Sequence, residues 1–178
     1  PDPLIVFTGQ MDYRPNIEAV SDFARNALPA IREAHPETTF AIVGRNPTPA
    51  VVELSALPGV QVTGAVDDVR TWLAGADVVV APLRIARGIQ NKVLEAMAMA
   101  KPVVASTAAA EGIDAVDGEH LLVARDASDE ATKVAALLSD TDQRLRLSAA
   151  ARAHVIAHYG WDAQLALLDS LMEAGAAK

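Results

Sequence analysis

Short apolar runs alternate along the chain with segments that have the periodicity of helices. This alternation constrains the fold most, because strands that are separated by helices pair in parallel and are covered by helices on both faces. The chain is 51% apolar but only 4% aromatic, so its core must consist of Ala, Val, Leu and Ile, as suits a buried sheet. The sequence therefore predicts an α/β fold with a doubly wound parallel six-stranded sheet. The expected strands are residues 4–8, 39–43, 60–63, 77–81, 103–105 and 120–123.

Helices are expected between these strands, except between the last two, and after the last strand. Pro29 is expected to kink or split the first helix, and Asp67 or Asp68 could cap the third. No strand follows the last three helices, which are extra C-terminal helices on the domain. The expected helices are residues 16–34, 49–56, 67–74, 90–100, 129–139, 142–158 and 162–174.

Length, charge and cysteine content limit the possible functions. A chain of 178 residues predicts a single domain. Its net charge of −8 argues against general nucleic-acid binding, although a local basic cluster can still bind a small anion because salt screens charges beyond ~8 Å. The absence of cysteine excludes disulfides, thiolate metal sites and a cysteine nucleophile.

The chain lacks the apolar runs of ~18 residues that membrane helices need, and no signal peptide is visible. We therefore expect a cytoplasmic location. The chain starts without Met and enters strand-like sequence at once, so we expect it to be part of a longer protein.

Ligands of open α/β sheets bind beyond the carboxyl ends of the strands. Gly9, Gly44 and Gly64 follow three of the expected strands. Glycine allows a sharp turn or close approach to a ligand, but short strand-to-helix turns often contain glycine for structural reasons alone. Both interpretations remain open.

The turn before the fourth expected helix and the first turn of that helix carry three basic residues, Arg84, Arg87 and Lys92, close to Gly88 and Asn91. First-turn amides of a helix have no partners within it and attract anions. Cations are unfavourable there unless an anion is bound, so the cluster indicates a diphosphate-sized ligand. The alternative is that these are solvated loop charges.

Glu95 lies one turn after Asn91, on roughly the same face of this helix. Its carboxylate could accept two hydrogen bonds from a ribose diol. It could equally be a surface residue that pairs with Lys92.

Residues 91–105, NKVLEAMAMAKPVVA, resemble the signature of the group 1 retaining glycosyltransferases of GT-B fold. The resemblance implies that residues 1–178 are a single sugar-nucleotide-binding domain, the C-terminal half of such an enzyme. The N-terminal domain, which binds the acceptor, would be absent from this chain. Further segments that resemble the family, in the same order, are residues 7–9, 62–66, 77–82, 111–123 and 159–161.

The resemblance also implies roles for individual residues. Glu95 would bind the ribose, and backbone groups near Val66 would face the base. Independently of the resemblance, the basic cluster places Arg87 and Lys92 where they would stabilise the charge that develops on the departing diphosphate, which makes them the predicted catalytic residues. The other residues predicted to bind the nucleotide are Gly9, Arg14, Arg84, Gly88, Ile89, Gln90 and Asn91.

The implied reaction is retaining sugar transfer from a nucleotide-diphosphate sugar, without a metal or other cofactor. The acceptor would be a sugar or a lipid-linked sugar, in polysaccharide or glycolipid biosynthesis. The isolated domain is expected to be inactive. Any peripheral contact with the inner membrane would be made through the missing half.

This sequence departs from the family at two places. The family usually has a glutamate at the position of Arg87, and a guanidinium cannot accept hydrogen bonds from sugar hydroxyls. It can pair with phosphate or with an acidic sugar. The basic residues that usually follow the first strand are shifted, and Arg14 is the nearest replacement.

Two other patterns could be taken for metal sites. Asp140 and Asp142 lie between two expected helices and are interpreted as capping residues. His154 and His158 have the spacing of a metal pair, but no third ligand is evident, which favours a role on a helix face. Two alternative functions remain: a GT-B-like sugar-nucleotide epimerase and a non-catalytic flavodoxin-like binding module.

Overall fold

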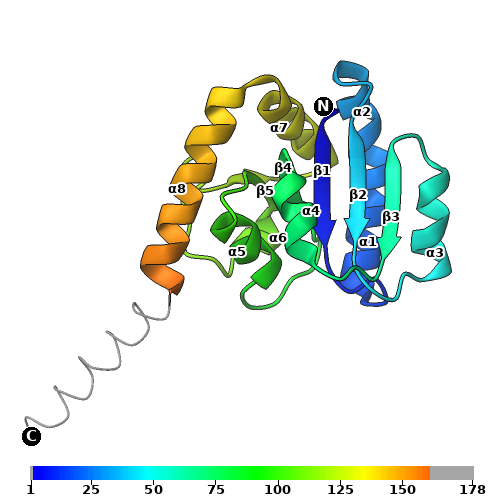
Figure 1. Ribbon diagram of the computed structural model, residues 1–178, viewed down its shortest axis with the longest axis horizontal. Helices are drawn as coiled ribbons and strands as arrows, with labels where there is room; N and C mark the ends of the chain where they lie inside the picture. The colour runs from blue at the N-terminus through cyan, green and yellow to red at the C-terminus, as the bar shows by residue number, and fades with distance from the viewer. Residues whose placement is uncertain (1, 161–178) are drawn as a thin grey trace, which may run out of the picture.

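The computed structural model describes residues 2–160, so the helix expected over residues 162–174 lies outside the described part. Six strands form one parallel sheet in the order β3-β2-β1-β4-β5-β6 (Figure 1). The chain winds outward from β1 in one direction and then returns to add β4 to β6 on its other side. The predicted doubly wound six-stranded parallel sheet is confirmed. The strands are β1 (Leu4–Thr8), β2 (Thr39–Val43), β3 (Val60–Gly64), β4 (Val78–Ala81), β5 (Val103–Ser106) and β6 (Leu122–Ala124).

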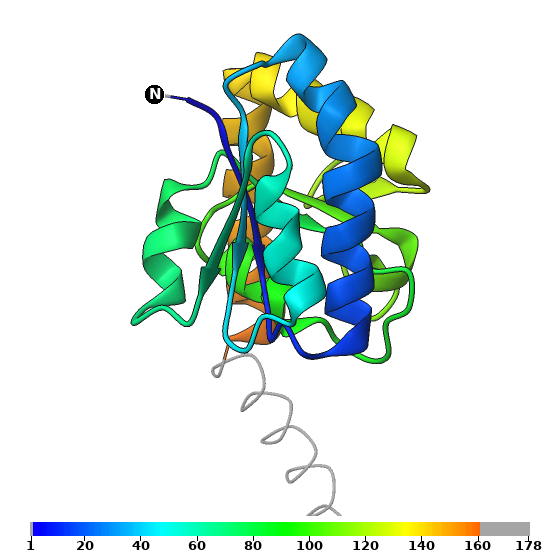
Figure 2. The ribbon, with the colours of Figure 1, turned by 90° about the vertical axis from the view of Figure 1, so that its right-hand side faces the viewer.

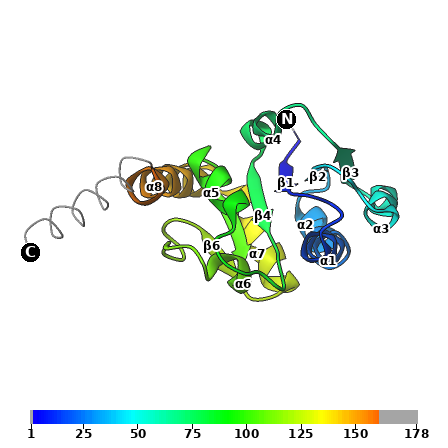
Figure 3. The same ribbon diagram turned by 90° about the horizontal axis from the view of Figure 1, so that it is seen from below.

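Helices cover both faces of the sheet. Figure 3 shows α4, α5 and α8 on one face and α1, α2, α6 and α7 on the other, and Figure 2 shows α1 and α2 stacked end to end. The fully buried side chains of the core include Ile5, Phe7, Phe40 and Ile42 from the central strands. The helices are α1 (Arg14–Asp22), η1 (Phe23–Ala27), α2 (Leu28–Ala34), α3 (Pro49–Val52), η2 (Glu53–Ala56), α4 (Val69–Gly75), α5 (Asn91–Ala98), α6 (Thr107–Ala110), α7 (Ala127–Ser139) and α8 (Thr141–Tyr159).

The first expected helix is split, as Pro29 predicted. Phe23–Ala27 forms a turn of π-helix, and the N–H of Leu28 bonds to the carbonyl of Phe23. A proline has no N–H and its ring clashes with the carbonyl four residues earlier. The wider turn just before Pro29 lets the chain continue as α2 in nearly the same direction.

Side-chain caps fix several helix starts. Asp68 accepts a hydrogen bond from the N–H of Arg70 at 2.9 Å, and Asp140 accepts one from the N–H of Gln143 at 2.8 Å. These contacts confirm capping for Asp140 and select Asp68 over Asp67. The sequence did not predict α6, a single turn that Ser106 caps, because four residues are too few to show a period.

Ala100 adopts a left-handed backbone conformation, with φ of 54°, just after α5. This conformation costs an L residue ~1–2 kcal/mol, which exceeds the ~0.4–1 kcal/mol that glycine loses through chain entropy. We therefore expect Ala100→Gly to raise the free energy of unfolding by about 0.5–1 kcal/mol, measured by urea denaturation. The matched control is Ala149→Gly at an exposed position inside α8, which should lower it by ~1 kcal/mol. A lower stability of Ala100→Gly would contradict the explanation.

Within residues 2–160, none of the helices combines the length and the hydropathy that a membrane span requires.

Candidate functional site

A cavity of about 840 Å³ opens at the carboxyl edge of β1, β2 and β3, where ligands of this fold class bind. In Figure 1 this is the edge toward which the strand arrows point. Its walls come from the turns after the three strands and from one side each of α4 and α5. The lining residues are Thr8, Gly9, Gln10, Val43, Gly44, Arg45, Ala65, Val66, Val69, Arg70, Leu73, Lys92, Glu95, Ala98 and Met99.

Two backbone turns approach each other closely at the cavity floor. A Cβ atom on Gly44, whose φ is 153°, would lie 1.6 Å from the carbonyl oxygen of Gly9. The N–H of Gly9 donates to the carbonyl of Val43 at 3.0 Å, and that of Met11 to the carbonyl of Arg45 at 2.8 Å. Glycine at position 44 is therefore required by packing, in agreement with the structural interpretation of this residue.

Lys92 brings a cation to this floor from the first turn of α5. Its Nζ donates to Oδ1 of the buried Asn16 at 2.6 Å and lies 4.2 Å from the centre of the Phe7 ring. A Cβ atom on Gly9 would be 3.0 Å from Nζ, so glycine gives the ammonium room beside the turn. Burial lowers the pKa of Lys92 to about 8, while the nearby Glu95 opposes the shift.

The start of α5 offers backbone donors next to Lys92. None of the side chains in residues 2–160 caps this helix at Gln90; instead, Nε2 of Gln90 donates to the carbonyl of Arg87 at 3.2 Å. Orphan first-turn amides carry partial positive charge. Lys92 and this helix end therefore form a positively polarised region beside the cavity.

The loop before α5, residues 82–90, joins β4 to α5 and is here called the β4–α5 loop. Gly88 has φ of 64°, and a Cβ atom on Gly112 would lie 2.5 Å from its carbonyl oxygen. The loop therefore packs closely against the backbone that follows α6. Arg87 is exposed, and Ile89 is 52% exposed.

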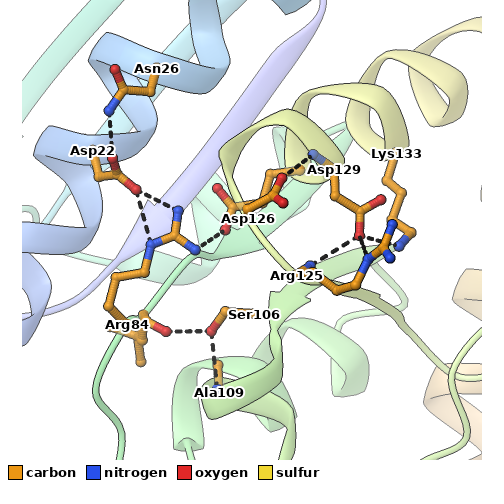
Figure 4. A network of polar contacts seen from close by, with 11 residues as sticks. Asp22, Asn26, Arg84, Ser106, Ala109, Arg125, Asp126, Asp129 and Lys133 are labelled. Atoms are coloured by element: carbon orange, nitrogen blue, oxygen red, sulfur yellow. Dashed lines mark hydrogen bonds and ion pairs between the residues drawn. The ribbon is translucent and has the colours of Figure 1, made fainter.

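Arg84 does not line the cavity, because its guanidinium is engaged elsewhere. Nε donates to Oδ2 of Asp22 at 3.0 Å, and Nη1 lies 3.4 Å from Oε1 of Glu130. Figure 4 shows the Arg84 side chain turned toward Asp22 at the end of α1 and toward the start of α7. Arg14 also has an acidic partner, since its Nε donates to Glu18 at 2.7 Å on the exposed surface of α1.

The structure thus brings Gly9, Val66, Lys92 and Glu95 together around one cavity. The predicted residues of the β4–α5 loop and the start of α5 are adjacent in sequence to this group. Gln10, Arg45 and Arg70 also line the cavity, and sequence reasoning missed them. Gln10 and Arg45 directly follow the glycines that end β1 and β2, and this position was the available signal.

His154 and His158 lie on one face of α8, as expected. The ring of His154 stacks on those of His120 and His158, with centroids 4.0 Å and 4.2 Å apart. Within residues 2–160, no three His, Cys, Asp or Glu side chains are grouped so that they could hold a metal ion.

Comparisons with known proteins agree with this architecture. Residues 2–140 match the sequence model of a family described as "Glycosyl transferases group 1". The chain is 29% identical over 167 residues to a phosphatidyl-myo-inositol mannosyltransferase of Propionibacterium freudenreichii, an alignment that covers 89% of this chain and 40% of that protein.

Two solved structures show the same fold. The C-terminal domain of the group 1 family glycosyl transferase LpcC of Francisella tularensis is 22% identical, with a TM-score of 0.71 over 90% of this chain and 87% of that one. Anabaena HepE in complex with UDP is 16% identical, with a TM-score of 0.74 over 99% of this chain and 49% of that one. The chain thus spans less than half of the longer relatives.

Proposed function

Since the chain belongs to the group 1 family of glycosyl transferases, we propose that its cavity binds the nucleoside diphosphate part of a sugar-nucleotide donor. The observation that carries this proposal is the partly buried Lys92 ammonium at the cavity floor. None of the carboxylates in residues 2–160 forms a salt bridge with it. A buried cation without a counter-ion is unfavourable, and a bound diphosphate would supply one. HepE, which shares the fold, contains UDP in its crystal structure.

The cavity offers a different surface for each part of such a ligand. Apolar side chains of α4 and α5, including Val69, Leu73 and Met99, form a wall beside Val66 that suits a flat base. The exposed carboxylate of Glu95 would accept hydrogen bonds from the ribose hydroxyls. The diphosphate would lie against Lys92 and the first-turn amides of α5. The donor sugar would then point toward Arg87 in the β4–α5 loop.

The chemistry follows from where charge develops. When the bond between the anomeric carbon and the diphosphate oxygen breaks, negative charge grows on the departing diphosphate. Lys92, the amides of α5 and the Arg87 guanidinium would stabilise that charge without a metal ion. We propose retaining transfer, with Arg87 and Lys92 as the catalytic residues. Direct contact of Arg14 or Arg84 with the nucleotide remains a prediction. In this structure each of the two arginines pairs with an acidic side chain.

The chain accounts for only part of the proposed enzyme, since it spans 40% of the related mannosyltransferase. We place the acceptor site, and any peripheral contact with a membrane, in an N-terminal domain of the same protein. The acceptor would be a sugar or a lipid-linked sugar in polysaccharide or glycolipid assembly. Residues 1–178 alone should transfer no sugar, because half of the catalytic cleft is missing.

Calorimetry with UDP and GDP tests the proposal directly. We expect one of them to bind this chain with one-to-one stoichiometry and with equal affinity in the presence of EDTA and of Mg²⁺. Loss of binding in EDTA would contradict metal independence. Binding of neither nucleotide, both to this chain and to the full-length protein, would contradict the proposed site.

The pKa of Lys92 predicts how binding depends on pH. A bound diphosphate stabilises the ammonium, so the pKa of Lys92 in the complex exceeds the value of about 8 in the free chain. Binding therefore takes up a proton above pH 8. We expect the dissociation constant to be nearly constant below about pH 7 and to rise by up to about tenfold per pH unit above pH 8. Calorimetry across this range checks the slope, and a flat profile would show that Lys92 does not contact the phosphates.

A further inference from the structure

The β4–α5 loop is attached to the rest of the domain at both of its ends. Near α5, the backbone of Gly88 approaches Gly112 closely. Leu83 is buried, and its carbonyl accepts a hydrogen bond from Oγ of Ser106 at 2.5 Å. Beyond it, Ile85, Arg87 and Ile89 are exposed. Arg84 stands at the boundary between the buried and the exposed parts of the loop. Its contacts therefore add to those of Ala86 and Gly88 in holding residues 85–90.

Arg84 links the loop to two helices on the opposite side from the cavity. Its partner Asp22 is the last residue of α1, where the π-helical turn begins, and Glu130 lies in the first turn of α7. Only 34% of the Arg84 side chain is exposed, and only 2% of the Glu130 side chain. Figure 4 shows the guanidinium between Asp22 and the start of α7. One side chain thus connects three segments that are far apart in sequence.

Glu130 is an unusual residue for this position. It is 1% exposed, and neither carboxylate oxygen has a hydrogen-bond partner among the described residues. Burial raises the pKa of Glu130 to about 7; Arg84 opposes the shift, while Asp22, Asp126 and Asp129 add to it. A leucine there would avoid the cost of burying a charge. The Glu130 carboxylate is therefore expected to add little to the stability of the domain. Its contribution is to give Arg84 a partner in a fixed position.

We propose that Arg84 is a positioning residue of the donor site: by bridging Asp22 and Glu130 it holds residues 85–90, and with them the start of α5, in place. The role in donor binding rests on the proposed function, whereas the attachment of the loop can be tested without any donor. Arg84 need not touch the nucleotide to act in this way.

The loop itself contains a probe of its attachment: Arg87 is exposed, and we expect trypsin to cleave after it when the loop opens. Rapid opening makes the cleavage rate follow the population of the open state. We expect Arg84→Met to be cleaved after Arg87 about tenfold faster than the wild type, measured by mass spectrometry. The matched control is Arg70→Met, which removes an exposed arginine that pairs with Asp68 beside the cavity, and it should leave this rate unchanged.

A second variant separates positioning from stability. Arg84→Met strands the buried Glu130 carboxylate and lowers the stability of the domain, and it could even prevent folding. The double variant Arg84→Met with Glu130→Leu removes both charges and should recover wild-type stability in urea denaturation. Its cleavage after Arg87 should stay fast. If its cleavage returns to the wild-type rate, the role of Arg84 is only structural and the inference is overturned.

The pH dependence of cleavage separates the attachment of the loop from the stability of the whole domain. As the pH rises toward 7, the loop should become more firmly held while the domain becomes less stable. Ionised Glu130 holds Arg84 more strongly than the neutral acid, so cleavage after Arg87 should slow as the pH rises through 7. At each pH, the rate of cleavage after Arg87 is divided by the rate at which trypsin cleaves a free peptide with the loop sequence. The same burial makes the free energy of unfolding fall as the pH rises from about 4.5 to about 7, because the folded state binds more protons there. The single variant Glu130→Leu is the control for this profile. If its normalised cleavage rate depends on pH in the same way as that of the wild type, the inference is overturned.

Nucleotide affinity completes the test. If the wild type binds UDP or GDP, the double variant should bind it about five- to tenfold more weakly, because the start of α5 is no longer held. Unchanged affinity together with fast cleavage would overturn the positioning role. If the wild type binds neither nucleotide, the proposed function fails, and slow cleavage in Arg84→Met would separately refute the attachment.

Discussion

Replacing Lys92 by methionine is expected to weaken nucleoside diphosphate binding by about 10- to 100-fold while the domain stays folded. The ammonium is the only cation among the described residues that both lines the cavity and is largely buried. Charge-assisted hydrogen bonds are worth ~1.5–3 kcal/mol, and ~1.4 kcal/mol corresponds to a tenfold change in affinity. Methionine keeps most of the length of the side chain without its charge, and it lacks the Nζ atom that lies over the Phe7 ring.

The stability of this variant distinguishes a lost ligand contact from a damaged fold. Because burial lowers the pKa of Lys92, the charged form costs the folded state free energy below pH 8. Lys92→Met should therefore have a free energy of unfolding at pH 7 equal to or above that of the wild type. Binding is measured by calorimetry and stability by urea denaturation.

The matched control is Lys101→Met. Lys101 donates from Nζ to the carbonyls of Ala74 and Ala76 at 2.6 Å and 3.0 Å, outside the nucleotide cavity. We expect its affinity for the nucleotide to equal that of the wild type. Equal losses in the two variants would show that general charge, and not the position of Lys92, governs binding.

Gly44→Ala is expected to lower the free energy of unfolding by about 3 kcal/mol or more. The added Cβ would overlap the carbonyl of Gly9 at 1.6 Å, and both contacting groups are backbone. The turns after β1 and β2 must separate, which strains or breaks the hydrogen bonds from Gly9 to Val43 and from Met11 to Arg45. The same movement would displace Gly9 from Lys92, so nucleotide binding should be lost as well.

Gly75→Ala serves as the control for a glycine without such a contact. Its Cβ would meet only a side-chain carbon of Leu4 at 3.7 Å, at the end of α4. We expect a small gain of ~0.4–1 kcal/mol from the reduced freedom of the unfolded chain. Similar losses in both variants, measured by urea denaturation, would show that the turn at Gly44 can open without strain.

The sequence identified the half of the candidate site that lies on one helix and at one strand end. Helical spacing placed Lys92 and Glu95 near one another on the helix after the basic turn, because three-residue spacing determines which side chains share a face. The resemblance to the family then assigned roles to Glu95 and Val66, and all three residues line the cavity together with Gly9.

The surroundings of Arg84 could not be predicted in the same way. Arg84 has partners 62 and 46 positions away, on α1 and α7. Glu130 has the sequence context of an exposed residue in a first helical turn, yet it is buried. It is the packing of α7 against α2, the π-helical turn and the sheet, which brings distant segments together, that creates this buried partner for Arg84.

The sequence by itself determined the alternation of strands and helices, the parallel sheet and the edge where a ligand can bind. These features follow from hydrophobic periods and glycine positions that lie within a few residues of one another. The tertiary structure alone decided which charges meet. Lys92 lies beside the turns after β1 and β2, and Arg84 lies between two carboxylates, because charge pairing depends on distances between elements that no local pattern specifies.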